Sequence, residues 1–200
     1  PKEYNGYKVY GDDGCQIVSP IDVELISKVR ALSIEEVNFT ANEELIIPLG
    51  EEMDSAYIKR LQTLCLSPDA IKEQSELPIV FTGIHGTGAV LVPKALNAFG
   101  FTNVHTVASQ DVIDGNFPTV HSPNPEEPAA LELAIKLAKE KGAQLVMGTD
   151  PDADRVGIAI PDKSGDFVLL NGNQTGSLLV NYLLTRWDEL GKITGKEFVA

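Results

Sequence analysis

Short apolar runs alternate with amphipathic stretches along the chain after Pro78. The runs are rich in β-branched residues and predict five strands: 79–82, 104–107, 143–147, 156–160 and 167–170. Apolar residues at helical spacing predict three helices between and after them: 90–99, 128–141 and 173–190. Strands of this kind, separated by helices, indicate an α/β fold with a mixed, largely parallel sheet and helices on both faces.

The pattern before Pro78 is different. A GDDG turn between two β-rich runs predicts a hairpin, so residues 1–18 are expected to be sheet. Apolar positions at helical spacing predict a helix over 22–32, and the acidic segment 33–52 is irregular and ends in a predicted domain boundary. Asp54 is predicted to cap the next helix, which is expected to bury apolar residues such as Tyr57.

Composition narrows the possible partners. The formal net charge of -13, with no local cluster of Lys or Arg, argues against a nucleic-acid backbone and favours cations. Cys15 and Cys65 form no C-x-x-C pattern, no apolar run is long enough to cross a bilayer, and a cytoplasmic protein is expected. The chain opens on Pro1 without an initiating Met, so it is also expected to be a piece of a longer protein.

Three aspartates stand at alternate positions after a predicted strand, in the stretch MGTDPDADRVG. Asp150, Asp152 and Asp154 can converge on one point in a looping segment, where like charges need a cation to neutralise them. Carboxylate oxygens are typical ligands of Mg²⁺, which leaves a position for a substrate phosphate. Arg155 follows directly and suits a phosphorylated ligand, although an ion pair with its own aspartates is the alternative.

Other sites explain this stretch less well. A calcium EF-hand loop requires Gly at its sixth position and Glu at its twelfth, where this chain has Arg155 and Pro161. An aspartate-nucleophile phosphatase of the haloacid-dehalogenase type uses D-x-D-x-T, which Asp150 and Asp152 match while Asp154 replaces the threonine. A solvated acidic turn also remains open.

The other conspicuous residues are assigned no catalytic role. The GIHGTG stretch has its glycines in the order G-x-x-G-x-G, which favours a tight strand-to-helix turn over a dinucleotide site. His85, His105 and His121 are dispersed, and none is chosen as catalytic. Asn124 and Glu126 are expected to cap the helix that begins near Pro128.

GTDPDADRVG resembles the metal loop of the α-D-phosphohexomutases, the phosphoglucomutase and phosphomannomutase superfamily, and PKEYNGYKVY resembles the segment after that family's phosphoserine loop. The resemblance covers most of the chain and looks closer to the phosphoglucomutase and phosphopentomutase branch, because Pro151 replaces the usual glycine. It implies a domain II fold of the phosphoglucomutase type, Mg²⁺ held by Asp150, Asp152 and Asp154, and a phosphosugar substrate. Arg155 would assist the phosphoryl group, and Lys8 would act as acid or base.

The chain lacks three loops that the family uses, namely the nucleophilic serine loop, a G-E-E-S-G loop and an R-P-S-G-T loop. The resemblance therefore implies an internal segment that needs the remaining domains of its parent: 1–50 as the C-terminal part of domain I, 51–165 as domain II, and 166–200 as the start of domain III. Such a segment is expected to be inactive alone. An aspartate-nucleophile phosphatase and a non-catalytic cation-binding module are the alternative functions.

Overall fold

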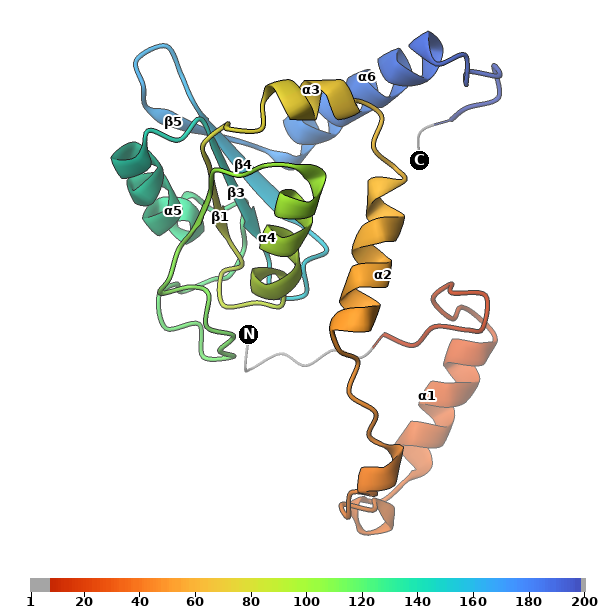
Figure 1. The fold of residues 1–200 in the computed structure, drawn as a ribbon. Coiled ribbons are helices and arrows are strands. Elements are labelled where there is room, and N and C mark those ends of the chain that lie inside the picture. Colours follow the sequence, from red (N-terminus) through yellow and green to blue (C-terminus); the bar gives the residue numbers. More distant parts are fainter. Residues whose placement is uncertain (1–7, 199–200) are drawn as a thin grey trace. The chain divides into compact units, whose positions relative to one another are not determined.

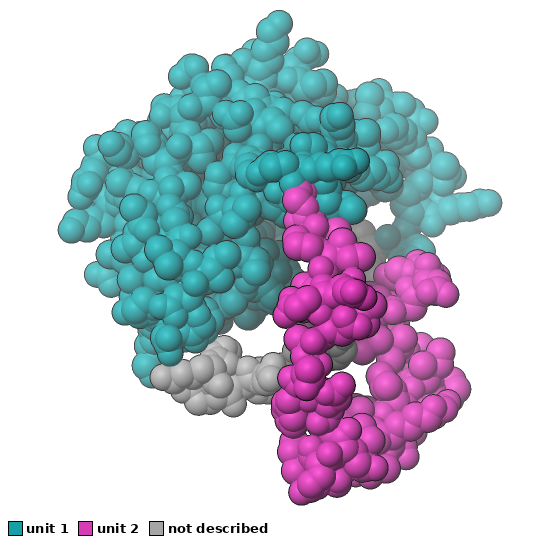
Figure 2. Space-filling view, turned by 60° about the horizontal axis from the view of Figure 1, so that its bottom comes forward, with its two compact units in different colours: residues 1–2, 51–200 teal, residues 3–50 magenta. Residues whose placement is uncertain are grey.

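The computed structural model of the chain describes residues 8–198 (Figure 1). Contacts within the chain divide it into two compact units, which Figure 2 distinguishes by colour: unit 1 is formed by residues 1–2 and 51–200, and unit 2 by residues 3–50. The assignment of the chain to parts of three domains stays a prediction. None of the described helices is both long and apolar enough to cross a bilayer.

The described part of unit 2 is helical and has no core. Its elements are α1 (Ile21–Ala31), η1 (Ile34–Glu36) and η2 (Glu43–Leu45). The expected hairpin is reduced to one antiparallel bridge between Tyr10 and Gln16, and residues 1–7 of the predicted sheet lie outside the described residues. No residue between 8 and 50 is buried, so this unit holds no apolar cluster of its own in the described part of the chain.

Unit 1 begins with two helices, α2 (Glu51–Gln62) and α3 (Pro68–Glu73). The prediction that Asp54 caps α2 is wrong, because the helix already begins at Glu51 and the Asp54 carboxylate pairs with Lys94 at 2.9 Å. Tyr57 is also 52% exposed rather than buried. Spacing located the helix, but it did not show which apolar positions the rest of the protein covers.

A five-stranded mixed sheet organises the remainder of unit 1, in the order β2-β1-β3-β4-β5. Its strands are β1 (Ile79–Thr82), β2 (Val104–Thr106), β3 (Leu145–Thr149), β4 (Val156–Pro161) and β5 (Phe167–Leu170). β1 pairs in parallel with β2 and β3, whereas the β3–β4 and β4–β5 pairs are antiparallel. The predicted mixed sheet is confirmed, with its antiparallel part beginning after the loop that carries the aspartates.

Helices cover both faces of this sheet (Figure 1). α4 (Gly88–Phe99) lies on one face and α5 (Pro128–Lys141) on the other, while α6 (Gly172–Glu189) follows β5. Small apolar residues of α5 pack against the sheet in the largest buried cluster: Val80, Val107, Ala134, Ala138, Ala143, Val146 and Ala159. Burying this apolar surface holds the strands in place beneath the aspartate loop.

Gly176 provides a test of the helical assignment of the C-terminal segment. It lies inside α6, and a Cβ there would meet no heavy atom of the described residues within 4 Å. Gly176→Ala is therefore expected to raise the free energy of unfolding by about 0.5–1 kcal/mol, because alanine favours the helix. Urea denaturation monitored by circular dichroism measures the change, and a loss of stability would contradict this packing.

Candidate metal centre

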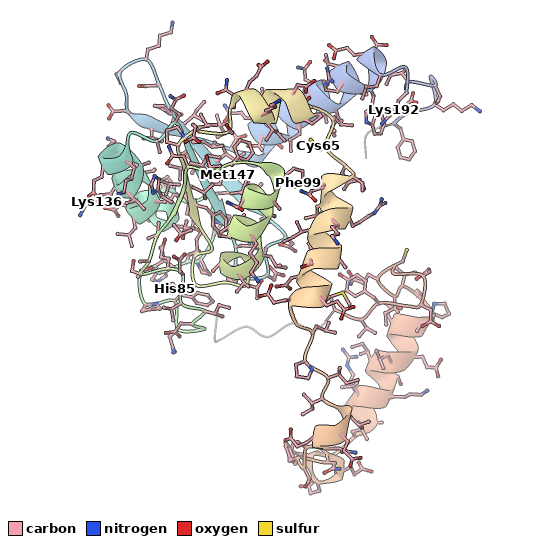
Figure 3. All side chains as sticks on the ribbon, viewed as in Figure 1. Cys65, His85, Phe99, Lys136, Met147 and Lys192 are labelled. Atoms are coloured by element: carbon pink, nitrogen blue, oxygen red, sulfur yellow. The ribbon has the colours of Figure 1, made fainter. Side chains whose placement is uncertain are left out.

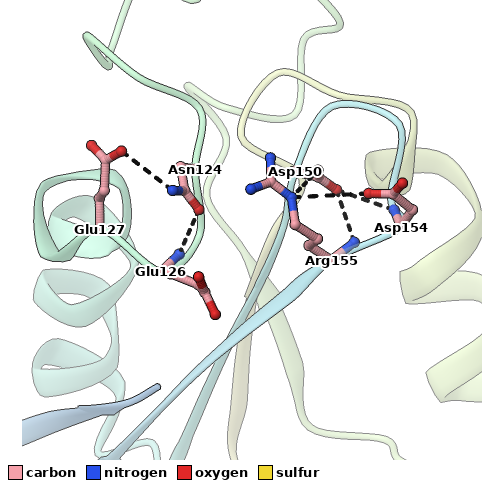
Figure 4. Close-up of polar contacts among 6 residues, drawn as sticks. All are labelled: Asn124, Glu126, Glu127, Asp150, Asp154 and Arg155. Carbon is pink, nitrogen blue, oxygen red and sulfur yellow. Dashed lines mark hydrogen bonds and ion pairs between the residues drawn. The ribbon is translucent and has the colours of Figure 1, made fainter. Parts of the chain in front are cut away.

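The three aspartates lie on the loop that joins β3 to β4, at the carboxyl end of β3. Figure 4 shows the first and the third of them, Asp150 and Asp154. The antiparallel ladder runs up to Thr149 opposite Val156, so both ends of the loop are fixed on neighbouring strands. Ala153 adopts a left-handed conformation with φ 59°, which turns the backbone between the second and third aspartates. The loop 150–155, called the metal loop below, is thus a tight reversal of the chain.

Asp150 closes this loop from inside. Its side chain is 2% exposed, and Oδ1 accepts the backbone N–H groups of Asp154 and Arg155, each at 3.1 Å. Oδ2 accepts the Arg155 Nε–H at 2.8 Å. These three hydrogen bonds offset the cost of burying a carboxylate. Asp150 therefore contributes a negative charge to the site and also fixes the conformation of the loop.

The carboxylates gather as the sequence predicted. One oxygen from each of Asp150, Asp152 and Asp154 lies within 4.8 Å of the others, and the latter two side chains are exposed. Like charges at such separations repel one another, and a cation bound between them would offset that repulsion. An all-oxygen donor set suits a hard divalent ion, so these residues fit Mg²⁺. The structure brings the donors together, and the identity of the ion stays a prediction.

Arg155 is half exposed beside this cluster, with its Nε 4.0 Å from the Asp154 carboxylate. Its hydrogen bond to Asp150 raises the pKa of the guanidinium above the usual value, so it stays charged at any physiological pH. The ion pair that the sequence left as an alternative is present. The pair also presents an exposed cation next to the carboxylates, which is the arrangement expected for contact with an anionic ligand.

Lys8, the predicted acid or base, belongs to unit 2 and is exposed. The metal loop belongs to unit 1, and the preceding residues of the NGYK motif, 5–7, lie outside the described residues. The role of Lys8 therefore stays a prediction.

One of the three histidines that the sequence left without a catalytic role lies on the turn after β1. His85 is 2% exposed and lies near the loop that follows β2 (Figure 3), with its Nδ1 2.9 Å from the Val112 carbonyl oxygen and its Nε2 2.8 Å from Thr119 Oγ1. Because a carbonyl oxygen only accepts, Nδ1 carries a hydrogen, and in the neutral ring Nε2 accepts from the threonine hydroxyl. Both ring nitrogens are occupied by structural bonds.

The loop before α5 forms a turn rather than a helix cap (Figure 4). Asn124 Oδ1 accepts the Glu126 N–H at 3.1 Å, and its amide donates to Glu127 at 3.3 Å. The helix begins at Pro128 as predicted, but its N-cap is Glu127 and no side chain caps it. The expected capping by Asn124 and Glu126 is therefore wrong, because Asn124 bonds within its own turn.

Comparison with known proteins gives a consistent set of relatives. The family described as phosphoglucomutase/phosphomannomutase, alpha/beta/alpha domain II, matches residues 55–165. A probable phosphomannomutase of Haemophilus influenzae is 42% identical over 193 residues, which are 94% of this chain and 38% of that protein. A phosphoglucomutase of Staphylococcus epidermidis is 38% identical over 195 residues, 95% of this chain and 35% of that protein.

A crystal structure of a phosphoglucomutase/phosphomannomutase family protein from Burkholderia thailandensis also matches, with 25% sequence identity and a TM-score of 0.42. The match covers 57% of this chain and 22% of that one. The chain thus spans little more than a third of the length of the curated relatives described above.

Proposed function

Because the chain belongs to the phosphoglucomutase/phosphomannomutase family, we propose that it is part of a magnesium-dependent phosphosugar mutase. Such an isomerase moves a phosphoryl group between positions 1 and 6, or 1 and 5, of a hexose or pentose phosphate through a phosphoserine. In this proposal the phosphoserine and the remaining domains of the parent protein lie outside the chain. The names of the relatives, a probable phosphomannomutase and a phosphoglucomutase, support the reaction class.

The observation that carries the proposal is the convergence of three carboxylate oxygens within 4.8 Å at the end of a buried strand. Asp150, Asp152 and Asp154 would hold Mg²⁺, which supplies positive charge where a phosphoryl group is transferred. Phosphoryl transfer depends mainly on alignment and charge neutralisation, and a loop fixed at both ends suits that task.

The roles of the two cationic residues follow from their chemistry. Arg155 is positively charged and has a half-exposed guanidinium that the bond to Asp150 holds beside the carboxylates, so it would orient the phosphoryl oxygens. Lys8 would act as acid or base on the sugar hydroxyl. The strongly acidic chain disfavours nucleic acid as a partner. A phosphosugar substrate and a cytoplasmic location remain part of the proposal.

The aspartate-nucleophile phosphatase is less compatible with the site. Its nucleophile would be Asp150, but this carboxylate is 2% exposed and both its oxygens already accept hydrogen bonds. A nucleophile needs an oxygen that can approach phosphorus in line. Trapping with a phosphate mimic distinguishes the two reactions, since a covalent adduct on Asp150 would support the phosphatase and contradict the mutase.

Asp152→Asn in the complete gene product is the direct test of the mutase. Activity is expected to fall at least about 100-fold, and the Mg²⁺ affinity of the protein is expected to fall with it, because one of the three charged ligands is lost. Glu140→Gln, the same charge change on the exposed surface of α5, is the control and should leave both unchanged. Full mutase activity of Asp152→Asn would rule out the assigned site. A wild-type gene product that binds Mg²⁺ but does not turn over substrate would support the non-catalytic module.

A further inference from the structure

The turn between β1 and α4, residues 83–88, lies directly against the metal loop. Gly86 approaches it so closely that a Cβ at this position would stand 2.4 Å from Pro151 Cα and 2.7 Å from the Pro151 carbonyl oxygen. Both are backbone atoms, which cannot move aside as the end of a side chain can. The two segments are 64 residues apart in sequence at Thr87 and Pro151, so this contact is made only by the fold.

Thr87 adds two hydrogen bonds to the same point. Its backbone N–H and its side-chain hydroxyl both donate to the Pro151 carbonyl oxygen, at 2.9 Å and 3.1 Å. Pro151 stands between two of the three aspartates, has no N–H of its own, and has its φ restricted by the ring. The Pro151 carbonyl group is therefore held in place by the two hydrogen bonds from Thr87.

The turn itself is anchored in the protein interior. Ile84 and His85 have positive φ values of 45° and 61°, a conformation that costs energy for residues with side chains. The His85 ring bonds described above, together with its N–H donating to the Gln110 carbonyl at 3.0 Å, hold the turn in this shape. Gln110 is itself buried and bonds to Thr82 at 2.7 Å. A buried network thus maintains the strained turn that contacts Pro151.

We propose that Gly86 and Thr87 are positioning residues for the metal loop: they fix Pro151, so that the carboxylates of the adjacent aspartates are held together before a cation binds. The inference rests on the proposed function, since it assigns a role relative to the metal site. Asp150 closes the loop from one side through Arg155, and the turn fixes it from the other through Pro151. Preorganised donors lower the cost of ordering the site on binding.

The test is Mn²⁺ binding to the complete gene product, measured by electron paramagnetic resonance and by calorimetry. Mn²⁺ prefers the same carboxylate ligands as Mg²⁺, and its spectrum reports the symmetry of the donor set. Thr87→Val removes only the hydroxyl bond and should weaken Mn²⁺ binding about fivefold, which corresponds to one net hydrogen bond, whereas Thr87→Ser should restore the affinity. Thr87 is exposed, so neither change is expected to disturb the core.

Gly86→Ala should have the larger effect, at least about tenfold weaker Mn²⁺ binding with an altered spectrum, because the new methyl group displaces the loop. Gly115→Ala is the matched control: it lies in an exposed loop, and a Cβ there meets no described heavy atom within 4 Å. Urea denaturation of each variant shows whether the affinity changes independently of global stability.

The outcomes separate this inference from the proposed function. The positioning role would be overturned if Gly86→Ala and Thr87→Val both kept the wild-type Mn²⁺ affinity and spectrum. If Asp152→Asn abolished binding in the same experiments, the metal site itself would still be supported. An affinity that falls equally in Gly115→Ala, or that Thr87→Ser fails to restore, would also overturn it. No Mn²⁺ binding by the wild-type complete gene product would remove both claims. Should Gly86→Ala fail to fold, the Thr87 pair decides.

Discussion

Asp150→Asn is expected to lower the free energy of unfolding by about 2–3 kcal/mol and to abolish cation binding. The carboxylate accepts three hydrogen bonds from groups that remain in place, two backbone N–H groups and the Arg155 Nε–H. An asparagine keeps the shape, but its amide nitrogen is a donor and must face a donor in either orientation. At a position that is 2% exposed, water cannot replace the lost acceptor.

The comparison variant is Asp152→Asn, two residues along the same loop. Its side chain is exposed, so the expected change in the free energy of unfolding is within about 0.5 kcal/mol, although cation binding should also be lost. Urea denaturation of both variants without divalent ions measures the difference. An Asp150→Asn protein as stable as the wild type would show that this carboxylate does not hold the loop together.

Gly157→Ala is expected to destabilise the protein by about 3 kcal/mol, because the sheet has no room for a methyl group at this point. A Cβ on Gly157 would stand 2.0 Å from the Pro125 carbonyl oxygen and 2.7 Å from its carbonyl carbon. Pro125 is itself buried, and its loop leads into α5, so neither segment can retreat without opening the face of the sheet.

Thermal and urea unfolding of Gly157→Ala measure this cost against Gly176→Ala, the same chemical change on α6. The two are expected to have opposite signs, since one adds a methyl group to a filled space and the other to an open one. A Gly157→Ala protein with wild-type stability would mean that the loop at Pro125 yields easily.

Sequence reasoning was most accurate where local chemistry marks both ends of an element. The predicted bounds of β1, β5 and α5 agree with those in the structure. α5 has Pro128 at its start and Gly142 in the left-handed conformation at its end, with φ 64°, so both limits are set by residues with strong backbone preferences. The strands were predicted for a similar reason, because turn residues mark the ends of their short apolar runs.

Elements that depend on distant contacts were predicted less well. The helix α3 was not predicted, and the hairpin expected before Val18 is reduced to a single bridge between Tyr10 and Gln16. Apolar periodicity likewise could not show that Tyr57 stays exposed on α2. Which face of an element is covered depends on its neighbours, and those are set by the fold rather than by the local sequence.

The same distinction applies to the candidate site. Asp150, Asp152 and Asp154 were identified because alternation within one loop is a local signal, and their oxygens do converge. Gly86 and Thr87 were placed only in a tight turn, because their contact with Pro151 spans 64 residues. The glycine spacing gave a partial signal, since a glycine in such a turn suggests close backbone approach without naming the partner.

The mixed pairing of the sheet has a consequence for how the protein folds. β3, β4 and β5 form an antiparallel meander whose turns close within a few residues, whereas β1 reaches β3 only after a crossover that includes α4, β2 and α5. Local pairings close quickly and distant ones slowly. The hairpin that carries the aspartates can therefore assemble early, and the turn after β1 is expected to contact it only after the longer crossover has closed.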